Sequence, residues 1–301
     1  MELQVPPQKA PFLKKWVKYA LGFTALVFLL PLFSRMTHLD FNDHGKLAVV
    51  EVHGIITDSE DVVRQLSAYR RDDKILGIIL RIDSPGGAVA PSQEIYSEVL
   101  KIRASSKPVY ASMGNLAASG GYYIASATER IFANPGSVTG SIGVIMAFSN
   151  IEGLIDKIGV RPEVIKSGEF KDAGSPTRAM TEKERKYLQH VVDDVHSQFI
   201  DAVAESRDLP LSEVTKIADG RIFTGRQALD LKLVDELGGL ELVIEQLAMK
   251  TGIEGKPKII KEEEQASLTD FLLGSWSPTR SLQSVASPAF TPSLQFLWNL
   301  N

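Results

Sequence analysis

Two short apolar runs and two amphipathic segments alternate at the start of residues 46–261. Lys46–Val52 and Ile75–Ile82 are nearly continuous in apolar residues, which is typical of strands buried on both faces of a sheet. Residues 58–71 and 91–103 instead repeat apolar residues at helical spacing. Strands that alternate with helices predict an α/β fold, in which helices pack against a parallel sheet.

Shorter signals continue this pattern toward the C-terminus. Thr181-Glu-Lys-Glu184 is a capping box that opens a long helix. The apolar stripe of that helix runs through Leu188, Val191, Val192, Val195, Phe199 and Val203. The other predicted elements are strands at 109–110, 130–133 and 144–147, a helix beginning at Ser119, and helices at 225–231 and 239–250.

An apolar segment near the N-terminus has the length of a membrane span. Residues 16–33 are interrupted only by Lys18, and at a rise of ~1.5 Å per residue they nearly cross a hydrocarbon core of ~30 Å. Four lysines precede or open the segment and Arg35 alone follows it closely, which leaves the N-terminus in the cytoplasm and the body outside. A cleaved signal peptide is the alternative, but no Ala-x-Ala pattern follows. We therefore predict an uncleaved signal anchor in the lipid bilayer.

The composition changes again after about residue 262. Ser, Thr, Pro and Gln dominate there, with isolated apolar residues such as Phe271 and Phe296. We expect a flexible tail, or a tail that docks as a strand or helix in a neighbouring subunit's groove. The chain thus divides into an anchor with its linker (1–45), a central domain (46–261) and a C-terminal tail (262–301).

Charge and cysteine content exclude several kinds of function. The net charge is −4, and because residues 1–18 carry +3, the rest of the 301-residue chain carries −7. An acidic body has no electrostatic footprint for nucleic acid, so we expect no nucleic-acid partner. The chain has no cysteine, which rules out disulfides, thiolate metal sites and a cysteine nucleophile.

Ser119 is the strongest candidate for a nucleophile. It follows a run of small residues and precedes two glycines and an apolar helical pattern, which puts a hydroxyl where helix N–H groups are unpaired. The alternative is an N-cap serine on a packing helix. Asp83-Ser-Pro-Gly-Gly87 follows the strand at 75–82, so the N–H groups of its Gly-Gly pair and of Gly120 could form an oxyanion hole. A plain turn is the alternative for that motif.

Either a histidine or a lysine could be the general base that activates a serine nucleophile. The chain's histidines are His38, His44, His53, His190 and His196, and none lies in a glycine-rich loop. A Ser-His-Asp triad through His53 is one alternative. Lys171 is the other, as a lysine whose amine is neutral at the working pH, unless it is simply a solvated surface lysine. Ser141, in a glycine-rich turn, could hold that amine by a hydrogen bond.

Five motifs together resemble the signal peptide peptidase A family, the serine–lysine peptidases related to the ClpP and crotonase folds. The resemblance covers residues 46–255 in the short, single-copy form. The matching stretches are Ile82-Asp-Ser-Pro-Gly-Gly87, Ala118-Ser-Gly-Gly-Tyr-Tyr-Ile124, Val138-Thr-Gly-Ser-Ile-Gly-Val144, Ser167-Gly-Glu-Phe-Lys-Asp172 and Asp219-Gly-Arg-Ile-Phe-Thr-Gly225. The chain departs from the family where Thr177-Arg-Ala-Met-Thr181 replaces a Phe-Arg-Pro-Met-Thr pattern.

The resemblance implies roles for individual residues. Ser119 would be the nucleophile, Lys171 the general base, Ser141 the residue that positions the lysine, and Gly86 and Gly120 the oxyanion hole. It implies no metal and no cofactor. It also implies a ring-shaped homo-oligomer in which neighbouring subunits complete each site.

The resemblance also implies a substrate and a location. Cleaved signal peptide remnants and other short hydrophobic peptides would be cut at a bacterial inner membrane, with the catalytic domain on the periplasmic side. Two alternatives stay open: a crotonase-like acyl-CoA enzyme, and a scaffold or protease that regulates stomatin-type membrane proteins.

Overall fold

The computed structural model describes residues 45–262 and 294–297. The chain divides into Met1–Asp43 and His44–Asn301, and the fold described below belongs to the second unit. The predicted anchor at 16–33 lies outside the described residues. Among the helices that are described, none combines the length and apolar character needed to cross a bilayer.

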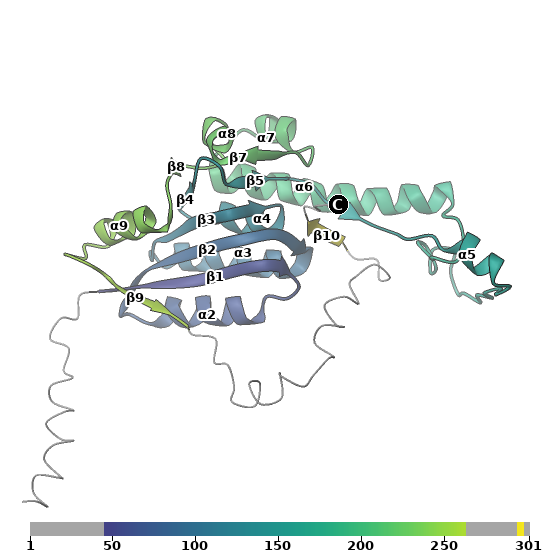
Figure 1. Cartoon of the computed structure of the whole chain (residues 1–301), viewed down its shortest axis with the longest axis horizontal. Helices are drawn as coiled ribbons and strands as arrows, with labels where there is room; N and C mark the ends of the chain where they lie inside the picture. The colour runs from purple at the N-terminus through teal and green to yellow at the C-terminus, as the bar shows by residue number, and fades with distance from the viewer. Residues whose placement is uncertain (1–44, 263–293, 298–301) are drawn as a thin grey trace, which may run out of the picture. The chain divides into compact units, whose positions relative to one another are not determined.

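Parallel strands joined by helices form the centre of a mixed α/β fold, as predicted (Figure 1). Strand order follows chain order, because each strand pairs in parallel with the next along the chain. The strands are β1 (Lys46–Ile56), β2 (Ile75–Ala88), β3 (Val109–Ala118) and β4 (Arg130–Ala133), and the helices between them are α2 (Glu60–Arg71), α3 (Val89–Ala104) and α4 (Gly120–Ser126).

Side-chain alternation divides the core into two layers. Ala48, Val50 and Val52 of β1 point to one face, where α2, α3, α4 and part of α6 (Glu182–Arg207) cover the sheet. Leu47 and Val49 point to the other face and pack with α9 (Leu240–Lys250). Burial on both faces explains why these strands are continuous apolar runs in the sequence.

The later elements complete the edges of the sheet. The predicted capping box of α6 is confirmed, because the Thr181 hydroxyl accepts from the Glu184 N–H and the Glu184 carboxylate accepts from the Thr181 N–H. The other elements are β5 (Val138–Gly140), β6 (Ile145–Met146), α5 (Glu152–Lys157), α7 (Leu211–Ile217), β7 (Ile222–Thr224), α8 (Gly225–Asp230), β8 (Glu236–Leu237) and β9 (Lys258–Lys261).

Two sequence interpretations need correction. The strand predicted at 109–110 is ten residues long, because pairing with β2 and β5 recruits the small residues up to Ala118. The segment 138–140, interpreted as a turn, is the strand β5, which pairs in parallel with β3 and antiparallel with β7. These pairings are tertiary, so the local pattern did not reveal them.

Four residues of the predicted tail form a strand. β10 (Leu294–Leu297) lies between β2 and β6 and runs antiparallel to both (Figure 1). Its register places Phe296 opposite Gly87 and Leu297 opposite Gly86. The C-terminal part of the chain thus returns to the carboxyl end of β2, where the candidate site lies.

Candidate active site

Ser119 stands at the junction of β3 and α4 in a strained backbone conformation. Its φ of 53° and ψ of −116° lie outside the helical and strand regions. Neighbouring bonds hold this geometry, since the Ser119 N–H donates to the Gly140 carbonyl at 2.8 Å and its carbonyl accepts from the Tyr123 N–H at 2.8 Å. The residue is 1% exposed. Such strain costs about 1–3 kcal/mol, and it recurs where a side chain must be aimed.

Ser141 occupies the matching position on the neighbouring strand. Ala118 and Gly140 are paired in the register of β3 and β5, and Ser119 and Ser141 come next on each strand. Ser141 also has a positive φ of 53°, and its N–H donates to the Arg221 carbonyl at 2.8 Å. The two buried serines therefore lie at the ends of neighbouring strands, whose backbones are about one strand spacing, ~4.8 Å, apart across the sheet.

Gly86 and Gly120 meet next to Ser119. Gly86 has a φ of +95°, and a Cβ built on it would lie 2.6 Å from the Gly120 nitrogen. A Cβ on Gly120 would in turn lie 3.2 Å from both the Gly86 Cα and the Gly87 nitrogen. Only glycine allows two backbones to approach this closely. The fold therefore gathers the N–H groups of two loops at the nucleophile, as an oxyanion hole requires.

The resemblance assigns the donor role to Gly86, but the structure already engages the N–H group of that residue. The Gly86 N–H donates to the Ser84 hydroxyl at 3.0 Å, and that hydroxyl donates to the Gly54 carbonyl at 2.6 Å. The Gly87 nitrogen lies as close to the Gly120 Cβ position as the Gly86 Cα does. Within the Gly86–Gly87 pair, Gly87 therefore also lies beside Gly120, and its N–H is a second candidate donor.

Lys171 lies on an exposed turn between α5 and α6. Its N–H donates to the Gly168 carbonyl at 3.2 Å, which closes the turn. In Figure 1 the α5 region lies at the far end of α6 from the sheet. The fold of one chain therefore gathers Ser119, Ser141, Gly86 and Gly120, and it carries Lys171 on a separate segment, residues 152–178, which we call the arm.

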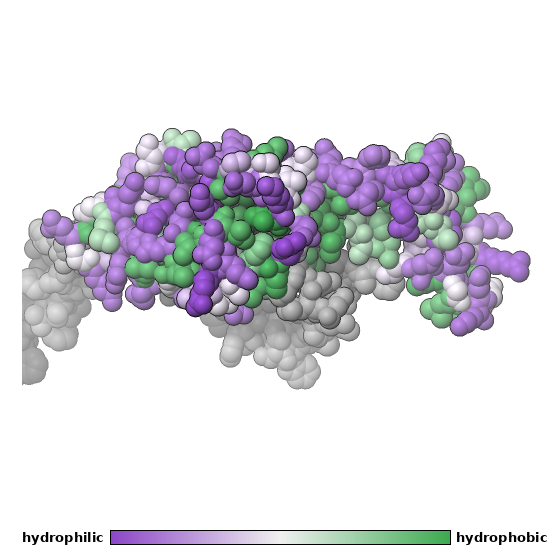
Figure 2. All heavy atoms as spheres, turned by 90° about the horizontal axis from the view of Figure 1, so that it is seen from above, coloured by the Kyte–Doolittle hydropathy of each residue, from purple (hydrophilic) through white to green (hydrophobic). Residues whose placement is uncertain are grey.

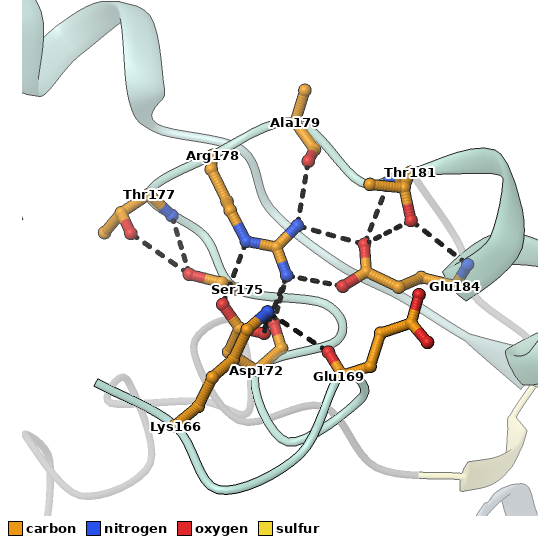
Figure 3. Close-up of polar contacts among 9 residues, drawn as sticks. All are labelled: Lys166, Glu169, Asp172, Ser175, Thr177, Arg178, Ala179, Thr181 and Glu184. Carbon is orange, nitrogen blue, oxygen red and sulfur yellow. Dashed lines mark hydrogen bonds and ion pairs between the residues drawn. The ribbon is translucent and has the colours of Figure 1, made fainter. Parts of the chain in front are cut away.

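Arg178 fastens the arm to the start of α6 (Figure 3). Its guanidinium donates to the Asp172 carboxylate at 3.0 Å and to the Glu184 carboxylate at 3.0 Å. Lys166 adds a contact of 2.6 Å to Asp172. Phe170, on the other side of Lys171, packs against Tyr187 of α6 with ring centroids 4.9 Å apart. Both neighbours of Lys171 are therefore held while its own side chain is exposed.

The ion pairs of this cluster shift the carboxyl pKa values. Arg178 lowers the pKa of Glu184 to about 2, with help from the Thr181 N–H. Arg178 and Lys166 also hold the pKa of Asp172 well below its usual range. Both groups are therefore charged at neutral and alkaline pH, where the cluster stays closed. Sequence reasoning missed Arg178, although its spacing of six residues from each carboxylate was a weak signal.

The structure separates the two histidines that bear on the choice of base. The His53 side chain is exposed beside Glu51, at 3.4 Å, and β2 lies between its strand and β3. Two strand spacings, about 10 Å, therefore part the β1 and β3 backbones. His196 of α6 instead lines a cavity of about 430 Å³ together with Ser141 and Leu297. Its position one residue after Val195, outside the apolar stripe predicted for this helix, gave no hint of this.

Comparison with known proteins identifies the family to which the chain belongs. The chain matches the family model of peptidase family S49 over residues 101–254 and that of Clp protease over residues 49–139. A putative protease of Synechocystis is 44% identical over 211 residues, which cover 69% of this chain and 76% of that protein. The matched regions contain both serines, both glycines and Lys171.

Relatives with more specific names are matched over less of their length. A putative signal peptide peptidase SppA of Enterococcus faecium is 36% identical over 67% of this chain and 62% of its own length. The chloroplastic serine protease SPPA of Arabidopsis thaliana is 34% identical over 72% of this chain but 32% of its own length. These matches favour a peptidase over an acyl-CoA enzyme. The chain belongs to peptidase family S49 and is a serine peptidase of the SppA type.

Proposed function

We propose that the protein cleaves short hydrophobic peptides, including signal peptide remnants, with a Ser119–Lys171 dyad and an acyl-enzyme intermediate. The observation that carries this proposal is the strained, buried Ser119 beside the Gly86–Gly120 backbone contact. A serine aimed at clustered N–H donors suits acyl transfer, because the donors meet the negative charge that develops on the attacked carbonyl oxygen.

The reaction divides into two displacements. The neutral amine of Lys171 takes the proton from the Ser119 hydroxyl while the oxygen attacks the peptide carbonyl carbon. The N–H groups of Gly120 and of the Gly86–Gly87 pair hold the oxyanion. The ammonium of Lys171 then protonates the leaving amine, and a water activated by the same lysine hydrolyses the ester. Ser141, one strand from Ser119, positions the lysine amine.

We further propose that Lys171 acts on Ser119 of another copy in a ring. Its exposed position on the arm, between two anchored neighbours, supports delivery to a second molecule. The arm also exposes large apolar side chains, which in Figure 2 contribute green spheres at the end that carries α5. These residues are Leu154, Ile158, Val160, Val164 and Ile165. Apolar surface of this kind marks an interface between protein chains.

The location belongs to the same proposal. An anchor at residues 16–33 would hold the domain on the periplasmic face of the inner membrane, where cleaved signal peptides remain in the bilayer. Regulation of stomatin-type membrane proteins is the second expectation from the sequence, and co-purification from membranes would test it.

Hydrolysis of a hydrophobic fluorogenic peptide by the full chain in detergent tests the dyad. We expect Ser119→Ala and Lys171→Ala to remove turnover, and His53→Ala and His196→Gln to keep it within a few-fold. Turnover should rise between about pH 6 and about pH 10, because only the neutral amine accepts the proton. A Lys171→Ala variant with near-normal turnover would refute the dyad, and loss of turnover in His196→Gln would make His196 the base.

A further inference from the structure

The loop that carries the candidate oxyanion donors contains two residues with little conformational preference of their own. Gly86 and Gly87 follow each other at the end of β2, and Gly86 has a φ of +95°. Glycine populates many backbone conformations because it has no side chain. Donors that meet a developing negative charge act best when they are in place before the reaction begins. A contact from outside the glycine pair is therefore needed to fix the loop.

Ser84 supplies that contact from inside the protein. It is 0% exposed, and its hydroxyl accepts a hydrogen bond from the Gly86 N–H at 3.0 Å and donates to the Gly54 carbonyl at 2.6 Å. A hydroxyl has one proton and two acceptor lone pairs, so both bonds form at the same time. Because the proton goes to Gly54, a lone pair is left for the Gly86 N–H. Ser84 thus ties the glycine loop to β1.

The backbone of β1 is shaped to receive this bond. The pairing of β1 with β2 shifts its register between His53 and Ile55, and Gly54 between them has a φ of +63°. A bulge of this kind leaves its extra residue unpaired in the ladder between the strands. The Gly54 carbonyl is the group that accepts the Ser84 proton. The bond therefore joins two strands at a point where their regular pairing is interrupted.

Asp83 holds the other side of the same loop. Its carboxylate accepts a hydrogen bond from the Leu116 N–H at 3.2 Å, and a Cβ built on Gly114 would lie 2.7 Å from that carboxylate. Asp83 thus packs into a notch of β3, while Ser84 reaches in the opposite direction to β1. Of these two side chains, Ser84 is the one that bonds directly to the glycine pair.

We propose that Ser84 is a positioning residue, whose hydroxyl holds the Gly86 peptide group and keeps the oxyanion hole formed before a substrate arrives. This inference rests on the proposed function and adds a residue that acts through the loop without touching the substrate. Because Ser84 engages the Gly86 N–H, it also leaves the N–H of Gly87 as the candidate donor beside Gly120. Loss of the hydroxyl therefore slows the chemical step and leaves the binding of the peptide unchanged.

Peptide hydrolysis by the full chain tests this role. We expect Ser84→Ala to lower kcat about 10- to 100-fold and to change KM by less than about 2-fold, because a misplaced donor costs part of what a lost donor costs. Ser84→Cys should lose nearly as much, because a thiol fills the space of the hydroxyl but is a weak donor and acceptor. The cysteine variant separates hydrogen bonding from packing, and it carries the test if the alanine variant does not fold.

Ser137 offers a matched control. It is 2% exposed, and its hydroxyl donates to the Gly114 carbonyl at 2.6 Å and accepts from the Asn134 N–H at 3.2 Å. This pattern of bonds is the same as that of Ser84, but it closes the turn before β5 instead of the glycine loop. We expect Ser137→Ala to lower the temperature of thermal unfolding as much as Ser84→Ala does, and to leave kcat unchanged.

A peptide boronic acid tests the oxyanion hole without turnover. The Ser119 oxygen bonds to boron as its proton passes to the base, and the tetrahedral adduct places a boron-bound oxygen where the oxyanion of the reaction forms. We expect the Ki of the boronic acid to rise in Ser84→Ala by the same factor as kcat falls, because a transition-state analogue responds to the same donors. Ser137→Ala should keep the Ki of the unchanged chain.

The outcomes separate this inference from the function on which it rests. Folded Ser84→Ala and Ser84→Cys chains with unchanged kcat and Ki would overturn the positioning role, and so would an equal loss of kcat in Ser137→Ala. A rise in KM with kcat unchanged would place Ser84 in substrate binding and overturn it as well. An unchanged chain that neither cleaves the peptide nor binds the boronic acid would instead refute the proposed function.

Discussion

Ser119 and Ser141 sit one residue beyond the paired Ala118 and Gly140 on neighbouring parallel strands, and each has a φ of 53°. The Ser119 N–H donates to the Gly140 carbonyl at 2.8 Å, so the two turns are joined by their main chains. The two serines therefore stand at adjacent strand ends, which is the geometry that the proposed role of Ser141 requires.

Removal of the Ser141 hydroxyl should slow the chemical step. We expect Ser141→Ala to lower kcat about 10- to 100-fold with little change in KM, because the amine of the base is less well aimed. Ser141→Gly is the matched variant, since it relaxes the positive φ but also lacks the hydroxyl. Equal losses in both variants would assign the effect to the hydroxyl, whereas full activity in Ser141→Gly would assign it to the backbone.

Gly86 should tolerate no side chain. Gly86→Ala places a methyl group against the Phe296 carbonyl and 2.6 Å from the Gly120 nitrogen, at a φ of +95°. We expect a loss of kcat of about 10²- to 10³-fold, as large as that from a lost oxyanion donor, because the methyl group pushes the Gly120 N–H out of place. Gly136→Ala is the control, because a Cβ there meets nothing within 4 Å. Thermal unfolding of both variants shows whether the Gly86 variant is folded, and normal turnover in it would contradict the assigned oxyanion hole.

Arg178 should act as a positioning residue for Lys171. Arg178→Gln breaks the bonds to Asp172 and Glu184, so the arm loses its anchor and kcat should fall about 10- to 100-fold while KM changes little. Arg178→Lys should recover only part of the rate, because an ammonium cannot bridge both carboxylates as the planar guanidinium does. Lys186→Ala, at an exposed position of α6, should leave kcat unchanged. Unchanged kcat in Arg178→Gln would contradict the positioning role.

Acid should open the arm only well below pH 4. The pKa of Glu184 is lowered to about 2 in the folded protein and that of Asp172 is lowered further, so the stabilisation they provide is complete above their ordinary values near 4. It is lost as the pH falls through the folded values. Pepsin should therefore cut residues 166–178 only near pH 2 in the unchanged chain, but already near pH 4 in Arg178→Gln. The same cutting profile in both chains would contradict the assignment of the lowered pKa to Arg178.

The sequence predicted those parts of the molecule whose signal is local. Lys46–Val52 and Ile75–Ile82 were predicted as buried strands because alternate residues face the two core layers and most of them are apolar. Thr181 and Glu184 predicted the start of α6 because a capping box needs only four residues. Ser119 stood out because its small and glycine neighbours are adjacent in the chain.

Elements that depend on pairing between distant segments could not be predicted from the local sequence. β5 is three residues long and exists because β3 and β7 hydrogen-bond to it. His196 reaches the site through the packing of α6, and Phe296 through a strand that follows a tail of polar composition. The position of Lys171 on an arm likewise depends on Arg178 and on ring packing.

The most direct test of a serine and a lysine contributed by different subunits is complementation. Full-length Ser119→Ala and Lys171→Ala chains, each without turnover alone, are produced together in one membrane and assayed with the fluorogenic peptide. Random mixing should restore about a quarter of the unchanged activity, because that share of sites in a ring joins an intact serine to an intact lysine. A mixture as inactive as its components would contradict the account and place the nucleophile and its base in the same chain.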